Sequence, residues 1–443
     1  RKPSLPHTAM GRFCRPRTEL VLALGREIEH LGSRRTQPTQ NSLLSVSLQG
    51  LVFGAASHVA ALGGHRAARD WWTGRLIPAP EGPFDLWIHG ASWGEFWMLE
   101  PLVRSFAGSG KRVLVTFFSP SGMRGWARYV APEGVVACLA PPDFEPYVRR
   151  FVDRVQPKAL LVLQTDLWPT MVLACRRRGI PFGVAFAHVP PEHRWWSLTG
   201  LLDRRLLRGA QFVGLQHTSG LAPAQKAGLR ALVLGDGRFD AAAARIGRGE
   251  GPLPGWDRFR DLRPLLVVGS SWPEDEAIWL PVLMRRTHWK FVFAPHDPAR
   301  ADEVIERLPM PALRSSAWGT YRDAQLEEAR VVVVDQIGQL FGLYGGAQAA
   351  FVGGAFKQGL HNIIEPLAWG LPVAFGPMLG RHWEAHDAQR DGVAETVAST
   401  DQALAWLDQN ESTPANAAWA ERQKGALRAL EAQLTLLNLV ASN

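Results

Sequence analysis

Cysteine is scarce in this 443-residue chain: Cys14, Cys138 and Cys175 lie far apart and form no C-x-x-C pair. That spacing argues against a disulfide framework and favours a reducing compartment. The sequence also lacks any group of histidine, cysteine and carboxylate residues at metal-ligand spacing, so we predict no bound metal. It contains no P-loop, no G-x-S-x-G and no G-x-G-x-x-G after a predicted strand, which removes three common enzyme signatures.

Uninterrupted apolar stretches of membrane-spanning length are missing too, so the sequence predicts no clear transmembrane helix. The nearest approach is residues 42–62, which carry no Asp, Glu, Lys or Arg. Cations and tryptophans follow, among them Arg66, Trp71 and Trp72, and this order is typical of a helix at a membrane interface. An ordinary buried first helix is the alternative. We favour a membrane-associated helix over residues 42–62.

Positive charge is concentrated at the start of the chain. Residues 1–40 contain eight Arg or Lys and three Glu, a net charge of +5, which leaves +3 of the formal +8 for the rest. A nearly neutral body gives no reason to expect a nucleic-acid-binding groove, and we predict no nucleic-acid partner. Residues 1–41 are polar and rich in Pro and Arg, so we expect a poorly ordered extension.

Short apolar runs alternate with longer amphipathic runs in two successive blocks, residues 63–240 and residues 263–443, the second ending in a long Ala-rich helix. A strand followed by a helix, repeated at this spacing, predicts parallel strands joined by crossovers. Residues 241–262, rich in Gly and Pro, are predicted to form the linker. The fold class predicted is α/β, with two Rossmann-like doubly wound domains facing a central cleft, the GT-B plan.

The run WIHGASWGE, residues 87–95, lies where the first strand ends and the first helix begins. Ser92-x-x-Glu95 has the spacing of a capping box, in which Glu95 only satisfies a backbone N–H, and spacing alone slightly favours that interpretation. A carboxylate at the crevice-facing end of an α/β sheet is also placed to take a proton from an acceptor hydroxyl, as a general base must. Both roles stay open for Glu95.

The run FVGGAFKQGLHNIIEP, residues 351–366, leads from a predicted strand through Gly353 and Gly354 into a helix. Glycines allow a backbone to approach a phosphate closely, and a helix start supplies free N–H groups. Glu365 is suited to accept hydrogen bonds from both hydroxyls of a ribose. The alternative is again a helix cap, Asn362-x-x-Glu365.

Three other strand ends carry polar groups that we expect in the same crevice. Ser270 and Ser271 follow the first strand of the second domain, where they either donate to a phosphate or cap a helix. His296 ends the next strand, and Gly338 lies in a candidate base-binding loop. Asp166 follows a first-domain strand, and its alternative role is to complement a helix dipole.

With these residues in view, the chain resembles the 3-deoxy-D-manno-octulosonic acid (Kdo) transferases. The resemblance runs from about residue 42 to residue 397. Six stretches occur in the family's order, namely WIHGASWGE, LVLQTDLWP, GDGRFD, GSSWPEDE, FVFAPHD and FVGGAFKQGLHNIIEP with GLPVAFGP.

The resemblance implies transfer of Kdo from CMP-Kdo to a lipid A precursor, lipid IVA, in lipopolysaccharide biosynthesis. It implies an inverting enzyme without metal or cofactor, at the cytoplasmic face of the inner membrane. Residues 63–240 would bind the acceptor and residues 263–443 the donor. Glu95 matches the family's catalytic base, and Ser92 and Asp166 are acceptor-side candidates. The donor-binding stretches include Ser270, His296, Gly338, Gly353, Gly354, Asn362 and Glu365.

The chain departs from the family pattern at three positions. Gln164 and Asp166 stand where the family usually has two glutamates, and Pro295 stands where an arginine often precedes the histidine. The alternative function is a GT-B transferase or epimerase acting on another nucleotide sugar, such as a UDP-sugar. A non-enzymatic membrane-bound interaction module is the remaining alternative.

Overall fold

The computed structural model describes residues 74–75, 78–261, 263–410 and 416–437. The predicted extension over residues 1–41 and the predicted helix over residues 42–62 lie outside the described residues. None of the helices in the described part of the chain combines the length and the apolarity that a membrane crossing needs.

The first domain is built on a seven-stranded sheet in which all paired strands are parallel. The strands lie in the order β3-β2-β1-β4-β5-β6-β7. Their bounds are β1 Leu86–Gly90, β2 Val113–Phe117, β3 Val135–Leu139, β4 Leu160–Leu163, β5 Phe182–Ala187, β6 Val213–Leu215 and β7 Ala231–Val233.

Helices cover both faces of this sheet and form two apolar layers. Helix α7 shows why the sequence folds this way: Val148, Phe151, Val152 and Val155 recur at helical spacing and are all buried. The helices are α4 Trp93–Trp97, α5 Glu100–Gly108, α6 Pro120–Trp126, α7 Glu145–Val155, α8 Pro169–Arg177, α9 Leu201–Leu207 and α10 Leu221–Lys226.

The second domain repeats the plan with a parallel sheet in the order β10-β11-β9-β8-β12-β13-β14. Its strands are β8 Leu265–Ser271, β9 Lys290–Pro295, β10 Leu313–Arg314, β11 Val331–Val333, β12 Ala349–Val352, β13 Val373–Phe375 and β14 Ala394–Thr396. Its helices are α12 Trp256–Arg260, α13 Pro273–Arg285, α14 Ala301–Arg307, α15 Asp323–Glu328, α16 Leu340–Tyr344, α17 Ile364–Ala368, α18 Trp383–Arg390 and α19 Thr400–Asn410. The predicted α/β class with two doubly wound domains is confirmed.

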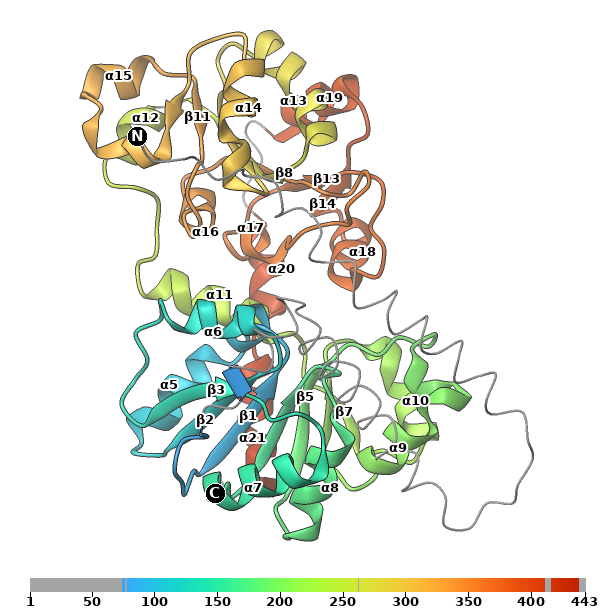
Figure 1. Cartoon of the computed structure of the whole chain (residues 1–443). Coiled ribbons are helices and arrows are strands. Elements are labelled where there is room, and N and C mark those ends of the chain that lie inside the picture. The colour runs from blue at the N-terminus through green and yellow to red at the C-terminus, as the bar shows by residue number, and fades with distance from the viewer. Residues whose placement is uncertain (1–73, 76–77, 262, 411–415, 438–443) are drawn as a thin grey trace, which may run out of the picture.

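Two segments between and after the sheets differ from the prediction. Residues 241–247, expected in the linker, continue helix α11, Gly237–Gly247, which lies between the two domains in Figure 1. The single long final helix is instead α20, Ala417–Arg422, and α21, Ala426–Leu434. The break falls at Gly425, whose φ of 107° is open to glycine but strained for other residues.

The final helix also belongs to the other domain. Its buried residues Ala426, Leu430 and Leu434 pack in the first-domain core beside Ile88, so its assignment to the second domain is wrong. The Asp240 carboxylate fixes the start of α21 by accepting hydrogen bonds from Gly425 N at 2.9 Å and Ala426 N at 3.1 Å. The reason is tertiary: the apolar stripe of α21 covers the first sheet, and the chain returns through α20 to reach it (Figure 1).

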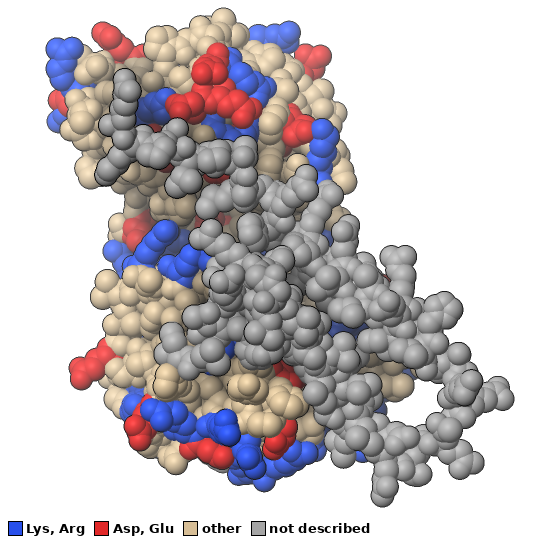
Figure 2. All heavy atoms as spheres, in the orientation of Figure 1, with Lys and Arg blue, Asp and Glu red and all other residues tan. Residues whose placement is uncertain are grey.

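The described surface mixes both signs of charge. On the face shown in Figure 2, Lys and Arg side chains are interspersed with Asp and Glu, and no single basic field stands out.

Candidate active site

Each sheet has a topological switch point, where the strand order reverses and a crevice opens at the carboxyl ends of the strands. In the first sheet the reversal flanks β1 and β4, and in the second it flanks β8 and β12. The predicted site residues Glu95 and Asp166 follow β1 and β4, while Ser270 is the last residue but one of β8 and Gly353 follows β12. In Figure 1, α6 and α11 lie on the side of the first domain that faces α16 and α17 of the second.

Glu95 lies in the first turn of α4, and its side chain turns back toward the preceding loop. Its Oε2 accepts a hydrogen bond from Ala91 N, whereas Ser92, the N-cap residue, makes no side-chain capping bond. Of the predicted capping box only the Glu95 half is present, in which the Ser92 backbone N–H donates to the Glu95 carboxylate. Burial raises the pKa of Glu95 to about 7, the Ala91 N–H opposes this rise, and the charge of Asp166 adds to it. A carboxyl group with a pKa near neutrality suits a general base.

Asp166 does not lie in a helix, since α8 begins at Pro169, so the helix-dipole alternative is wrong. Its Oδ2 lies 3.2 Å from His89 Nε2, and His89 is fully buried at the end of β1. On its other side, His89 Nδ1 lies 2.9 Å from Thr116 Oγ1, in the neighbouring strand β2. Sequence reasoning missed His89 and Thr116, because their partners come from other strands of the sheet.

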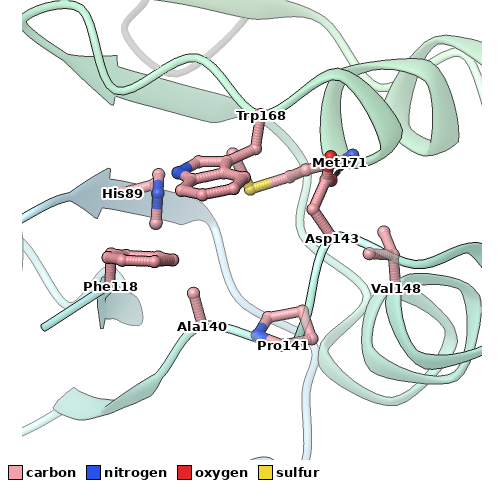
Figure 3. Close-up of a pocket in the computed structure, with 8 residues that line it drawn as sticks. All are labelled: His89, Phe118, Ala140, Pro141, Asp143, Val148, Trp168 and Met171. Carbon is pink, nitrogen blue, oxygen red and sulfur yellow. Dashed lines mark hydrogen bonds between the residues drawn. The ribbon is translucent and has the colours of Figure 1, made fainter. Parts of the chain in front are cut away.

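A small pocket opens beside His89 (Figure 3). Phe118 and Trp168 stack at a centroid distance of 4.6 Å and line it together with Met171 and Asp143. The Asp143 carboxylate accepts hydrogen bonds from Thr170 N at 3.2 Å and Met171 N at 3.0 Å, which fixes the start of α8. The pocket beside His89 is thus partly aromatic, and Asp143 ties its lining to the start of α8.

In the second domain, the glycine pair packs around a buried carboxylate that the sequence analysis left unassigned. Asp275 Oδ2 accepts hydrogen bonds from Gly354 N at 2.9 Å and from Trp272 N at 2.8 Å. A Cβ on Gly353 would come within 2.5 Å of this carboxylate and of Ser270 O. The packing of the protein itself therefore requires glycine at position 353, independently of any bound ligand. Burial raises the pKa of Asp275 to about 6.

Three flat side chains stack next to this turn. His296 stacks on Trp272 at 5.0 Å and on His361 at 4.3 Å, and Trp272 Nε1 donates to His361 Nε2 at 2.9 Å. Burial and the neighbouring His296 lower the pKa of His361 to about 4, so the ring is neutral at pH 7 and carries its hydrogen on Nδ1. His296 thus has a structural partner in His361, which belongs to the predicted donor-binding run of residues 351–366.

The serines take different places. Ser271 Oγ donates to the buried Glu276 at 3.0 Å, and the N-cap of α13 is Trp272, so neither serine caps the helix. Ser270 adopts a φ of 51°, which is uncommon for a residue other than glycine. Of the two serines, only Ser270 therefore remains a candidate to donate a hydrogen bond to a phosphate of the donor.

Glu365 lies in the first turn of α17 but does not form the predicted cap. Asn362 Oδ1 accepts from Ile364 N at 3.1 Å, while Glu365 Oε1 lies 3.5 Å from Arg245 Nη1 of α11. Burial raises the pKa of Glu365, and Arg245 opposes this rise. The Arg245 guanidinium also lies over the Phe341 ring at 3.6 Å. Glu365 is therefore held by the helix between the domains.

The structure gathers the predicted residues into two groups. Glu95 and Asp166 lie together in the first domain, and Ser270, Gly353 and Gly354 surround Asp275 in the second. Gly338, with a φ of 96°, lies in the loop between β11 and α16, and no described atom lies within 4 Å of a Cβ built there. Across the described residues, no three His, Cys, Asp or Glu side chains are grouped as a metal would require.

Contacts between the domains lie beside these groups. Arg238 of α11 forms an ion pair with Glu384 of α18 at 3.3 Å, and His217 Nε2 lies 3.3 Å from Asp387 Oδ2. The His217 ring also stacks on Trp383 at 5.0 Å. Both pairs join the carboxyl-end side of the first sheet to α18, so the two groups of site residues face a shared interdomain region.

Comparisons with known proteins agree on the family. The family model described as "3-Deoxy-D-manno-octulosonic-acid transferase (kdotransferase)" matches residues 62–241. The 3-deoxy-D-manno-octulosonic acid transferase of Bordetella pertussis is 27% identical over 391 residues, covering 82% of this chain and 89% of that protein. The protein of the same name from Haemophilus influenzae is 27% identical over 318 residues, covering 68% of this chain and 71% of that protein.

Solved structures support the fold. The UDP-GlcNAc 2-epimerase of Neisseria meningitidis, bound to UDP-GlcNAc, superposes with a TM-score of 0.54 at 12% identity, covering 80% of this chain and 99% of that chain. The epimerase of Methanocaldococcus jannaschii gives a TM-score of 0.53 at 11% identity, covering 79% of this chain and 99% of that chain. The family model covers the first sheet, and the Bordetella match extends across both domains, so the comparisons support the 3-deoxy-D-manno-octulosonic-acid transferase family for this chain.

Proposed function

We propose that this protein transfers Kdo from CMP-Kdo to a lipid A precursor, lipid IVA, in lipopolysaccharide biosynthesis. Kdo transferases are the relatives that match along most of the chain. One observation carries the chemistry, namely a carboxyl group, Glu95, with a pKa of about 7 at the switch point of the first sheet. The epimerase alternative rests on fold likeness alone, at 12% identity.

The proposed reaction is a single displacement with inversion. Glu95 accepts the proton of an acceptor sugar hydroxyl, and the hydroxyl oxygen forms a bond to the anomeric carbon of Kdo. The bond from that carbon to the phosphate oxygen breaks on the opposite side, and CMP leaves with the electron pair. Closure of the two domains brings the donor to the acceptor and excludes water. We expect no metal or cofactor to take part.

The donor is proposed to bind along the second-domain group. The loop after Gly354 and the His361 Nδ1–H group face the departing phosphate, and Glu365 accepts hydrogen bonds from the ribose. Ser270, His296 and Asn362 flank that path, and Gly338 borders the base. The ribose hydroxyls would replace Arg245 as partners of Glu365, since that pair is 3.5 Å apart and part-exposed.

The acceptor is a lipid, so we propose that the protein works at a membrane surface, the cytoplasmic face of the inner membrane. Residues 42–62, outside the described structure, supply the proposed contact with the membrane. Ser92 and the aromatic wall of Phe118 and Trp168 border the acceptor side of Glu95.

CMP is expected to stabilise the protein against thermal unfolding, and UDP is not. A ligand at 100 times its Kd adds about 2.7 kcal/mol, which raises Tm by roughly 5–10 °C for domains of this size. The measurement is a thermal-shift titration with CMP, UDP and GMP. Preferential stabilisation by UDP would favour the alternative nucleotide sugar, and no response to any nucleotide from a well-folded protein would favour an interaction module.

The rate of transfer is expected to rise with pH, with a midpoint of about 7 in kcat/KM. The folded-state pKa of Glu95 is raised from 4.5 to about 7, so the carboxylate that accepts the proton predominates only above that value. The measurement is initial rate against pH between 5 and 9. Residual turnover by a Glu95→Gln variant serves as the control and should lack this rise; a wild-type midpoint near 4.5 would contradict the assignment.

A further inference from the structure

Behind Glu95, four side chains form a row, namely Trp87 and His89 of β1, Thr116 of β2 and Asp166 of the loop after β4. Trp87 Nε1 donates to Thr116 Oγ1 at 2.8 Å, Thr116 Oγ1 lies 2.9 Å from His89 Nδ1, and His89 Nε2 lies 3.2 Å from Asp166 Oδ2. Trp87 and His89 share one face of β1, two residues apart, and His89 is the register partner of Thr116. Trp87, Thr116 and His89 are fully buried, and the Asp166 side chain is 14% exposed.

The row has a direction that the donor chemistry fixes. An indole N–H can only donate, so it occupies one lone pair of Thr116 Oγ1. The hydroxyl hydrogen has two possible acceptors, His89 Nδ1 at 2.9 Å and Ile88 O at 3.4 Å, and the second lies beyond the usual O–H···O range. Nδ1 is therefore the acceptor, and the ring hydrogen is assigned to Nε2. No hydrogen bond from that buried atom meets the full geometry among the described residues, so its 3.2 Å contact with Asp166 Oδ2 is an electrostatic one.

We propose that Trp87, Thr116 and His89 form a directional chain that keeps His89 neutral and holds a charged Asp166 carboxylate beside Glu95. These three residues and Asp166 are then the positioning residues of the base. The inference rests on the proposed function, in which Glu95 is that base. It gives Asp166 a role different from the acceptor contact predicted from the sequence.

The charge state of His89 matters because it decides how much of the Asp166 field reaches Glu95. Asp166 raises the pKa of Glu95, whereas a positively charged His89 would lower it and would also lower the pKa of Asp143 on the far side. A neutral imidazole leaves the Asp166 charge in place, whereas an imidazolium would cancel it. The indole two residues before His89 therefore helps to keep the proton affinity of Glu95 high.

The test compares the pH profile of transfer in four proteins, the wild type and the Asp166→Asn, Trp87→Phe and Trp195→Phe variants. Asp166→Asn should move the acidic limb of kcat/KM to lower pH by roughly one unit, because a neighbouring negative charge is lost. Trp87→Phe should move it in the same direction, because Thr116 Oγ1 then has both lone pairs, and not only one, available for an imidazolium N–H. Trp195 is the matched control, since it is equally buried in the same core cluster and its Nε1 has no partner among the described residues.

A second readout does not depend on activity. The ¹⁵N shifts of the 13 histidines are recorded against pH, and a His89→Gln variant identifies the His89 signals. The expected wild-type state at pH 7 is the neutral Nε2–H tautomer, and Trp87→Phe should raise the pH at which imidazolium appears. A wild-type imidazolium or Nδ1–H tautomer at pH 7 would overturn the proposal, as would an acidic limb that Asp166→Asn moves no further than Trp195→Phe. If the wild type fails to transfer Kdo, the proposed function is wrong. The histidine spectra would still show whether Trp87, Thr116 and His89 form the proposed hydrogen-bond chain.

Discussion

Glu95→Gln is expected to lower kcat for Kdo transfer by about 10³-fold, the middle of the range for loss of a general base. Gln has nearly the same shape and can still accept the Ala91 N–H, so the loop should keep its conformation. It cannot accept a proton from an acceptor hydroxyl. Donor binding should stay within about threefold of the wild type, because the second-domain group is unchanged. The measurements are single-turnover transfer and a CMP titration.

The same substitution should make the protein more stable at pH 8. The pKa of Glu95 is raised in the folded state above its ordinary value, so the stabilising contribution of its protonated form is complete below pH 4.5 and is lost as pH rises through about 7. A shift of this size corresponds to at most about 3 kcal/mol. Gln carries no charge, so Tm of the variant should exceed that of the wild type at pH 8 and match it near pH 4.5.

Glu100→Gln is the matched control for this experiment. Glu100 is also a buried carboxylate in the first turn of a helix, but it forms an ion pair with Arg248 at 3.2 Å and accepts from Tyr129 Oη at 3.0 Å. Its loss should lower Tm and leave kcat nearly unchanged. If Glu95→Gln were as active as the wild type, Glu95 would not be the general base.

Gly354→Ala is expected to weaken donor binding at least tenfold and to destabilise the second domain by about 2–4 kcal/mol. Gly354 is buried, its φ is 96°, and a Cβ there would lie 2.3 Å from Gly359 O. The carbonyl must therefore shift, and the loop from Gly354 to His361 shifts with it, which also disturbs the hydrogen bond from Gly354 N to Asp275. Calorimetric titration with CMP and thermal unfolding measure the two effects.

Gly359→Ala separates backbone strain from steric overlap. Gly359 has a similar φ of 99°, but it is exposed and nothing lies within 4 Å of a Cβ built there. We expect a loss of about 1 kcal/mol from strain alone and a donor affinity within about threefold of the wild type. Equal donor affinities for the two alanine variants would show that the packing around Gly354 does not shape the donor site.

Sequence patterns were sufficient for the elements and the general location of the site. The alternation of apolar runs predicted two doubly wound domains, and the motif residues follow strands that border the two switch points. Such predictions succeed because a parallel strand buried on both faces and an amphipathic helix differ in local periodicity. The strand–loop–helix spacing also placed Glu95 in the first turn of α4.

Local patterns failed where the partner of a residue lies far away in the sequence. The capping interpretation of Glu365 is wrong because Arg245, 120 residues away, holds its carboxylate. The glycine pair packs around Asp275, 79 residues from Gly354, and the last helix covers the first sheet. None of these pairings follows from the spacing of residues along the chain.

The sequence by itself determined the fold class, the strand ends that carry polar residues and the carboxylate at position 95. Only the tertiary structure decided that Glu95 has a raised pKa, because burial and the Asp166 charge cause the rise. It also decided that His89 stands between Thr116 and Asp166. The physical reason is that desolvation and charge interactions depend on distance in space, and the strand order of the sheet, which periodicity does not encode, sets those distances.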